Sequence, residues 1–197
     1  MLRFNNKLIR INGGLAEYTE PPVPEGTVTL LGKTYHTITI GTQTWLLECF
    51  AHDDGNGSIT IKQPSANGYN FGDVYYYTGT AAIRVANLVS GWHLPTDEEW
   101  NTLMNYVGTS NAMNDLCADY GWNSQYSNTT GFTILPYGYL NNTGGTPQSP
   151  GKMVSLWTST TSGSYQYKYQ FEIGSTQYRR TDGINSIGNP FRLIKDS

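Results

Sequence analysis

Charged residues are scarce in this sequence of 197 residues, since Asp, Glu, Lys and Arg make up 14% of it against about 25% in an average soluble domain. The sequence has no run of about 18 apolar residues, so no segment has the length of a transmembrane helix. Heptad repeats are also absent, which argues against a helical bundle. A formal net charge of −3 argues against a general nucleic-acid-binding protein.

Cysteine is also scarce, since the chain has only Cys49 and Cys117. Their spacing matches no metal-binding pattern, and neither has a histidine close in sequence that would activate a nucleophilic thiol. The two thiols are either paired in a disulfide or present as small buried hydrophobic side chains, and a reducing compartment favours the second alternative.

Catalytic and metal-binding motifs are missing as well. The sequence has no Gly-x-Ser-x-Gly nucleophile elbow and, in spite of 22 glycines, no phosphate-binding loop. The three histidines share no zinc-like spacing. Residues 53–57 resemble the start of a calcium loop but lack the distal glutamate, so a solvated turn is favoured. We therefore expect a protein that is not an enzyme and that carries no metal ion and no cofactor.

What the chain does contain is aromatic and small residues, with 15 Tyr, 5 Trp and 22 Gly. The aromatic mass favours a folded chain over a disordered one, and the length favours one domain with a short appendage. Three prolines within residues 21–24 predict a semi-rigid linker. We therefore divide the chain into residues 1–26, an N-terminal attachment segment with its proline linker, and residues 27–197, the main domain.

Alternating β-branched and aromatic residues predict strands along much of the main domain. The clearest spans residues 165–173, where Tyr, Phe and Ile alternate with polar residues. A turn at residues 174–175 should bring the next strand back to pair with it. Glycines and aspartates make residues 51–80 loop-like. The predicted strands are residues 8–11, 27–31, 35–40, 44–47, 156–159, 165–173 and 176–181, and residues 191–194 close the chain.

Two helices are predicted. Thr96 and Glu99 have the spacing of a capping box, and the apolar residues that follow from Trp100 recur every three to four positions. The second helix spans about residues 111–120 and ends at Gly121. Short strands around two helices indicate an α+β domain with small mixed β-sheets and a loop-rich C-terminal half.

Residues 165–185 have the composition of a binding surface. Tyr offers a large contact area for few frozen torsions, Ser, Gly and Asn offer adaptable hydrogen bonds, and Tyr and Arg dominate interface hot spots. The alternative, in which the alternating tyrosines line the inner face of the sheet, remains open, because periodicity does not say which side of the strand faces solvent. The predicted ligand-binding residues are Tyr165, Tyr167, Tyr169, Gln177, Tyr178, Arg179, Arg180, Asp182 and Asn185.

Several motifs, taken in order, resemble the Fibrobacter major paralogous domain family. The most specific is the Gly-Trp-His-Leu-Pro-Thr element that opens the first predicted helix, and the resemblance as a whole covers residues 35–196. They are Ile40–Glu48, Gly91–Trp100, Gly131-Phe132, Leu135–Tyr139, Leu156–Ser159 and Phe191–Asp196.

The resemblance implies a C-type-lectin-like fold, related to the sulfatase-modifying domains, with a small mixed sheet, two α-helices and the ends of the domain on adjacent strands. The calcium-lectin signatures Glu-Pro-Asn and Trp-Asn-Asp are missing, as are the reactive cysteines that formylglycine-generating enzymes carry late in the domain. Variable proteins of diversity-generating retroelements use this fold. Residues 165–185 are similar in position and composition to their C-terminal segment, where mutation at adenine-rich codons produces Tyr, Asn, Ser and Asp.

These resemblances lead to the expectation of a phage tail-associated receptor-binding protein, or adhesin. Residues 1–20 resemble the start of structural proteins from phages of gut bacteria, and we expect them to dock onto other virion tail proteins. The opening residues do not form a secretory signal. We therefore expect synthesis in the bacterial cytoplasm, a place in the virion tail, and a host cell-surface protein or glycan as the partner, with no nucleic acid and no membrane.

Three alternatives accompany this expectation. The first is a bacterial cell-surface adhesin or lipoprotein domain from which a signal has been removed. The second is an enzyme of the sulfatase-modifying type that uses one of the two cysteines. The third is a purely structural virion part whose tyrosines pack against a neighbouring subunit. The sequence names neither the receptor nor the oligomeric state, and a homo-oligomer is compatible with it.

Overall fold

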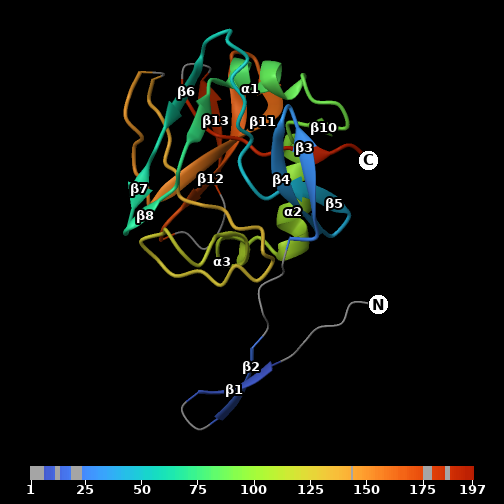
Figure 1. Ribbon diagram of the computed structural model, residues 1–197, viewed down its shortest axis with the longest axis vertical. Helices are drawn as coiled ribbons and strands as arrows, with labels where there is room; N and C mark the ends of the chain where they lie inside the picture. Colours follow the sequence, from blue (N-terminus) through green and yellow to red (C-terminus); the bar gives the residue numbers. More distant parts are fainter. Residues whose placement is uncertain (1–6, 12–13, 19–23, 143, 175–178, 185–186) are drawn as a thin grey trace.

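Two antiparallel sheets form the framework of the protein in the computed structural model (Figure 1), which describes residues 7–11, 14–18, 24–142, 144–174, 179–184 and 187–197. Of the strands within residues 7–18 and 179–184 it describes the backbone. One sheet has the strand order β10-β14-β5-β4-β3 and the other β11-β12-β13. Their strands are β3 (Gly26–Leu30), β4 (Lys33–Ile40), β5 (Gln43–Leu46), β10 (Trp92–His93), β11 (Met153–Ser162), β12 (Tyr165–Glu172), β13 (Arg179–Ile184) and β14 (Ile194–Lys195).

Three two-stranded pairs complete the β structure of the described residues. Two of them lie in the stretch of residues 51–80, so the prediction of a loop there was wrong. Val74–Tyr77 is an unbroken apolar and aromatic run, and it pairs with residues 59–62 across an intervening hairpin. The pairs are β1 (Lys7–Ile11) with β2 (Gly14–Tyr18), β6 (Ile59–Lys62) with β9 (Val74–Tyr77), and β7 (Ser65–Ala66) with β8 (Tyr69–Asn70).

The structure has three helices in its described part, one more than predicted: α1 (Gly79–Ala86), α2 (Asp97–Val107) and α3 (Ala112–Leu116). The capping box of α2 is confirmed, because the side chain of Thr96 accepts from Glu99 N at 3.1 Å and Glu99 accepts from Thr96 N at 2.7 Å. Helix α3 ends earlier than predicted because the chain turns extended at Cys117, which bridges to Ile134. The α+β class is confirmed.

Buried aromatic rings join the helices to the sheets. Trp100 of α2 has its ring centre 4.9 Å from that of Trp45 on β5 and 5.0 Å from that of Tyr169 on β12. A second cluster lies under α1, where Tyr77 packs 4.7 Å from Phe191. Because these rings are fully buried and come from both sheets, the core fixes the position of one sheet against the other.

The last strand, β14, lies between β10 and β5 in the five-stranded sheet. The first and last strands of the main domain therefore share a sheet, but the expectation that they are adjacent was wrong, since β4 and β5 separate β3 from β14. Arg192, just before β14, is buried and donates from Nη1 and Nη2 to the carbonyl oxygens of Phe132 and Thr133 at 2.6 and 2.8 Å. These bonds hold the C-terminal segment in the core.

His93 ties the same segment to α2. Its Nδ1 lies 2.6 Å from Oδ1 of Asp196, and its Nε2 lies 2.8 Å from Oε1 of Glu99. Partial burial disfavours the charged imidazolium, but hydrogen bonds to the two carboxylates outweigh it and raise the pKa of His93 above its ordinary value. A protonated His93 can donate to both carboxylates at once, so it links β10, the chain end and the capping box.

The stability that His93 contributes should depend on pH. Because its pKa is higher in the folded than in the unfolded chain, the contribution is fully present below about pH 6.5 and is lost as the pH rises through the folded-state value. We expect His93→Gln to lower Tm more at about pH 5.5 than at about pH 8.5, measured by circular dichroism. Asp196→Asn, which removes one carboxylate, should shrink this difference. An equal loss of Tm at both pH values would contradict the account.

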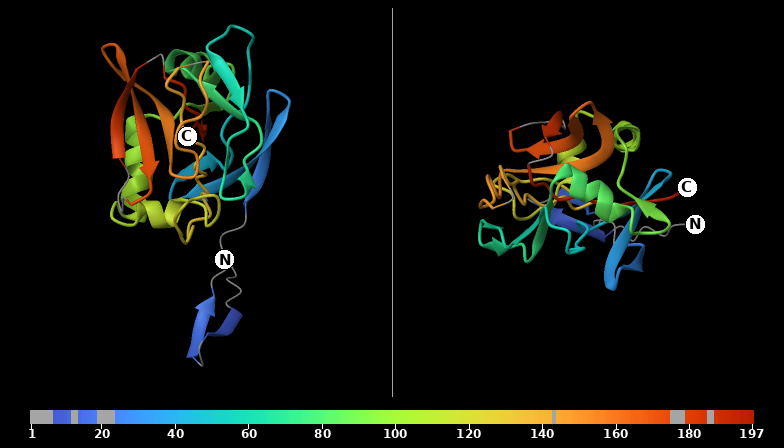
Figure 2. Two further views of the ribbon diagram at one scale, coloured as in Figure 1. Left: turned by 90° about the vertical axis from the view of Figure 1, so that its left-hand side faces the viewer. Right: turned by 90° about the horizontal axis from the view of Figure 1, so that it is seen from above.

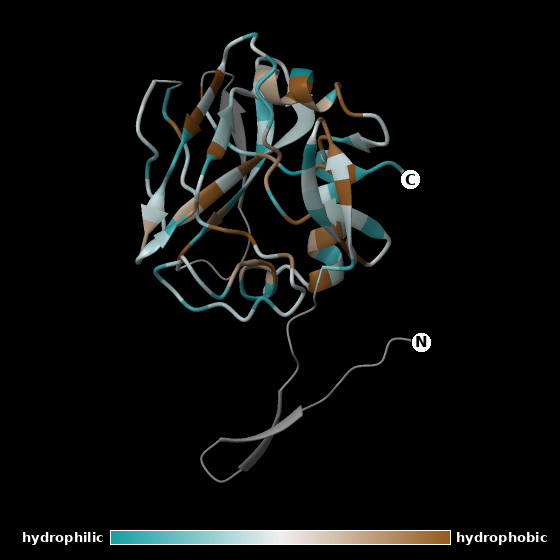
Figure 3. Ribbon diagram, in the orientation of Figure 1, coloured by the Kyte–Doolittle hydropathy of each residue, from teal (hydrophilic) through white to brown (hydrophobic). Residues whose placement is uncertain are grey.

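The hairpin β1–β2 forms a sheet of its own and lies away from the main body (Figures 1 and 2). The left view of Figure 2 shows the hairpin below the main body. Hydropathy colouring shows brown apolar residues on the strands and helices within that body (Figure 3), where both clusters of buried hydrophobic residues lie.

No described helix is both long and apolar enough to cross a membrane.

Removal of residues 1–20 should leave the main domain intact. Because β1 and β2 pair only with each other, we expect the free energy of unfolding to change by less than about 0.5 kcal/mol, measured by urea denaturation followed by tryptophan fluorescence. All five tryptophans lie outside the deleted segment, so the same probe serves both chains. A clearly destabilised truncated chain would mean that the hairpin packs on the domain.

Candidate ligand-binding surface

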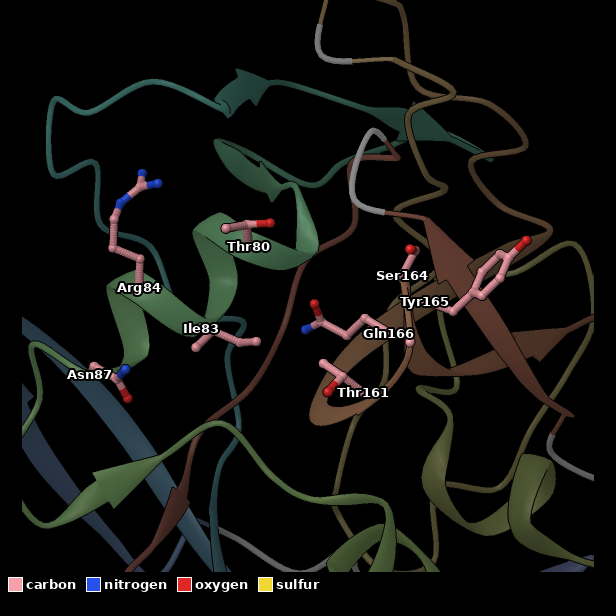
Figure 4. A pocket seen from close by; sticks show the side chains of 9 residues that line it. Thr80, Ile83, Arg84, Asn87, Thr161, Ser164, Tyr165 and Gln166 are labelled. Carbon is pink, nitrogen blue, oxygen red and sulfur yellow. The ribbon is translucent and has the colours of Figure 1, made fainter.

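A pocket of about 390 Å³ lies between helix α1 and the turn that joins β11 to β12 (Figure 4). Its walls come from two segments far apart in sequence, which the core packs side by side. Their side chains are small and polar apart from one isoleucine, one arginine and one tyrosine. The lining residues are Thr80, Ile83, Arg84, Asn87, Thr161, Gly163, Ser164, Tyr165 and Gln166.

Helix α1 supplies one wall because it is amphipathic. Thr78 caps it, with its side-chain oxygen accepting from Ala81 N at 3.3 Å. One face buries small residues, chiefly alanines, against the core. The other face carries Thr80 and Ile83, which line the pocket together with Asn87, the residue that caps the C-terminal end of the helix (Figure 4).

The turn between β11 and β12 supplies the other wall. Gly163 adopts a positive φ of 59°, which an L-residue rarely adopts, and a register shift between Trp157 and Thr161 bends β11 just before the turn. Beyond the turn, Gln166 is 1% exposed and donates from Nε2 to the carbonyl oxygen of Thr158 at 2.6 Å. The turn is thus anchored at its base while its tip is exposed.

Arg84 is the charged residue of this wall, and it is already paired. Its Nε and Nη2 donate to the carboxylate of Asp54 at 2.7 and 3.0 Å, and Nη2 also donates to the carbonyl oxygen of Gly57. The hydrogen bonds from Arg84 hold the pKa of Asp54 well below its usual range. The pair stays charged at neutral pH but adds no net charge to the pocket.

The three predicted tyrosines of β12 have different surroundings. Tyr165 is 51% exposed and lies at the rim of the pocket, and Tyr167 is half-buried. Tyr169 is fully buried, with its hydroxyl 2.9 Å from Oδ1 of Asn101, so its inclusion among the ligand-contacting residues is corrected: it is part of the core. The strand leaves the core toward its N-terminal end, where it meets the turn.

Strand β13 brings the predicted arginines beside β12. The pairing is antiparallel, and Arg180 lies opposite Tyr169 while Asp182 lies opposite Tyr167. The predicted partner strand is confirmed, although β13 runs from Arg179 to Ile184 where residues 176–181 were expected. Three further predicted residues, Gln177, Tyr178 and Asn185, lie outside the described residues.

The other side of β12 is also covered. Lys168 is 8% exposed, and its Nζ lies 5.9 Å from the ring centre of Tyr139, a cation–π arrangement. Burial lowers the pKa of Lys168. Both faces of this strand are therefore packed over its second half, whereas Tyr165 at its start is exposed.

Sequence reasoning missed the wall that α1 contributes. Residues 79–86 carry two adjacent alanines and a threonine cap, a signal that could have indicated a short helix. The glycine-rich stretch before them favoured a loop. Because α1 was not predicted, the sequence did not indicate that Thr80 and Asn87 lie near Tyr165 in the folded protein.

Both cysteines are free thiols, Cys117 buried and Cys49 half-buried, which confirms the favoured alternative to a disulfide. Burial raises the pKa of Cys49 to about 11 and that of Cys117 well above its ordinary value. The described residues hold no cluster of three or more His, Cys, Asp or Glu side chains that could bind a metal ion. Thiols that stay protonated at neutral pH are poor nucleophiles.

The fold and this surface define an α+β domain with a pocket at the turn end of its three-stranded sheet. The family model described as the Fibrobacter succinogenes major domain matches residues 38–195. Because the match covers most of the chain, the protein belongs to this family, as the motifs predicted. No curated protein and no solved structure matches the chain.

Substitutions at the first residue of β12 and at Tyr169 in its middle should distinguish a surface position from a core position. Tyr169→Ala removes a ring that stacks on Trp100, and we expect it to lower the free energy of unfolding by about 3–5 kcal/mol. Tyr165→Ala, at the exposed end, should change it by less than about 0.5 kcal/mol. Urea denaturation of both variants provides the measurement, and equal losses would contradict the assignment of Tyr165 to the surface.

Proposed function

We propose that this protein is a non-enzymatic receptor-binding protein of a phage tail, with a C-type-lectin-like fold that displays the β12–β13 edge to a host-surface glycan or protein. The observation that carries the proposal is the exposure of Tyr165 at the end of a strand whose other end is locked in the core. A binding protein that must adapt to a changing receptor needs such a division, because its contact residues can change while the fold persists.

The residue types on this edge support recognition by contact. Tyr165 offers an amphipathic ring at the surface, and Arg179, Arg180 and Asp182 occupy the neighbouring strand. Tyr supplies contact area, Arg supplies directed hydrogen bonds and charge, and Asp tunes specificity. In this proposal the segment from residue 165 to residue 185 corresponds to the diversified segment of retroelement variable proteins.

A binding role also agrees with the state of the two thiols. An enzyme of the sulfatase-modifying type would need a cysteine that reacts as a thiolate, whereas burial raises the pKa of Cys49 to about 11 and that of Cys117 well above its ordinary value. We therefore prefer the binding role to thiol chemistry.

In this proposal residues 1–20 attach the protein to the virion. The hairpin β1–β2 within them pairs only with itself, and an isolated two-stranded hairpin is marginally stable in water. Contact with another tail protein would supply the missing packing. The protein is then made in the bacterial cytoplasm and acts as part of the virion tail.

The test is binding of the purified chain to intact host cells. We expect Tyr178→Ala or Arg179→Ala to weaken binding by about 1–3 kcal/mol if each is a hot spot, with Tm unchanged. Tyr69→Ala, which removes an exposed tyrosine elsewhere on the domain, is the matched control and should bind as the parent does. Parental affinity in both variants would overturn the site assignment, and no binding to host cells would overturn the function.

A further inference from the structure

The pocket between α1 and the β11–β12 turn presents polar side chains that no other described residue pairs with. Among the described residues, the side chains of Thr80, Asn87, Thr161 and Ser164 make no hydrogen bond, although each lines the pocket. Side-chain hydroxyls both donate and accept, and an amide offers two donors and an acceptor. A ligand rich in hydroxyl groups would match this set, since each of its hydroxyls also donates and accepts.

The floor of the pocket also offers a hydrogen-bond acceptor, the side-chain carbonyl of Gln166. Gln166 is 1% exposed and uses Nε2 to donate to Thr158, while its Oε1 has no donor within the described part of the chain. The close view shows its amide directed toward α1 (Figure 4). Because Nε2 is held by Thr158, the amide is fixed in this orientation and presents Oε1 as a positioned acceptor for a ligand hydroxyl.

The rim and the opposite wall add apolar surface. The ring of Tyr165 is half exposed, and Ile83 lies on the α1 side. The faces of an aromatic ring are electron-rich, so they attract the C–H groups on the flat side of a pyranose.

An extended peptide could not add to the sheet at β12, because β11 and β13 already pair with both edges of this strand.

The electrostatics of the pocket select for a neutral ligand. Among its described lining residues, the one cation, Arg84, is held by the carboxylate of Asp54, and none is a carboxylate. A volume of about 390 Å³ lies near the lower end of the range for small-molecule sites, about 300–1,000 Å³. This is the scale of one or two sugar rings.

We propose that this pocket binds a neutral sugar residue, with Tyr165 stacked on its flat face, Gln166 Oε1 accepting from one hydroxyl, and Thr80, Asn87 and Ser164 bonding the others. The inference rests on the proposed function in naming the ligand class of the surface that contacts the host. It also identifies α1, outside the segment from residue 165 to residue 185, as a constant part of the site.

The test is an NMR titration of the isotope-labelled full chain with glucose, galactose, mannose and N-acetylglucosamine, and with N-acetylneuraminic acid as an anionic sugar. We expect at least one neutral sugar to shift the resonances of residues 80–87 and 161–166, with Kd in the millimolar range. Tyr165→Ala should raise Kd about fivefold or more, as a loss of about 1 kcal/mol implies, and Thr80→Trp should abolish binding by filling the pocket. Tyr69→Ala should bind as the parent does.

Failure of this inference is distinguishable from failure of the proposed function. Host-cell binding that persists while no neutral sugar shifts these resonances, or while only the anionic sugar does, would overturn the pocket assignment and leave the receptor-binding function standing. Sugar shifts at the pocket without any host-cell binding would support the pocket and overturn the function. Shifts that persist unchanged in both Tyr165→Ala and Thr80→Trp would place the sugar elsewhere and overturn the inference.

Discussion

The packing of Trp100 is the interaction on which the rest of the structure depends. Its indole lies between Trp45 of the five-stranded sheet and Tyr169 of the three-stranded sheet, and it also contacts Phe132 and Phe171. The Tyr169 ring is within 17° of parallel to it, an arrangement that adds about 0.5–1.5 kcal/mol to the burial of area. Through this one side chain α2 fixes the two sheets relative to each other.

That constraint explains why one strand can serve both core and surface. β12 is held at Tyr169 and Phe171 by Trp100, and on its opposite face Lys168 is buried against Tyr139. Toward Tyr165 the core ends, and the strand meets the turn that faces α1. Exposed side chains at that end contribute little to stability. Substitutions there can therefore change ligand binding without unfolding the domain.

Local sequence signals predicted the elements that depend on local chemistry. The capping box of Thr96 and Glu99 and the strand alternation over residues 165–173 are examples, and both are present. Local signals did not predict the elements whose type or length is determined by tertiary packing. Residues 74–77 form a strand despite glycine-rich flanks because Tyr76 and Tyr77 are buried, and α3 stops early because Cys117 pairs with Ile134.

The candidate site was predictable only in part for the same reason. Composition singled out the segment from residue 165 onward, and the structure keeps Tyr165 at the surface. A period of two says that Tyr165 and Tyr169 share a face of the strand, but it cannot say where α2 covers that face. The wall from α1 is separated from the turn by about 80 residues of chain, a proximity that only the folded core creates.

The central claim is that a fixed core supports a surface whose residues are free to change, and sequencing this gene across sibling genomes tests it most directly. The account predicts substitutions at adenine-derived codons between residues 165 and 185, with Tyr169 unchanged inside that segment because it stacks on Trp100. Trp45 and Trp100 should also be constant. Substitutions spread evenly along the chain, or a segment as constant as the core, would contradict the claim.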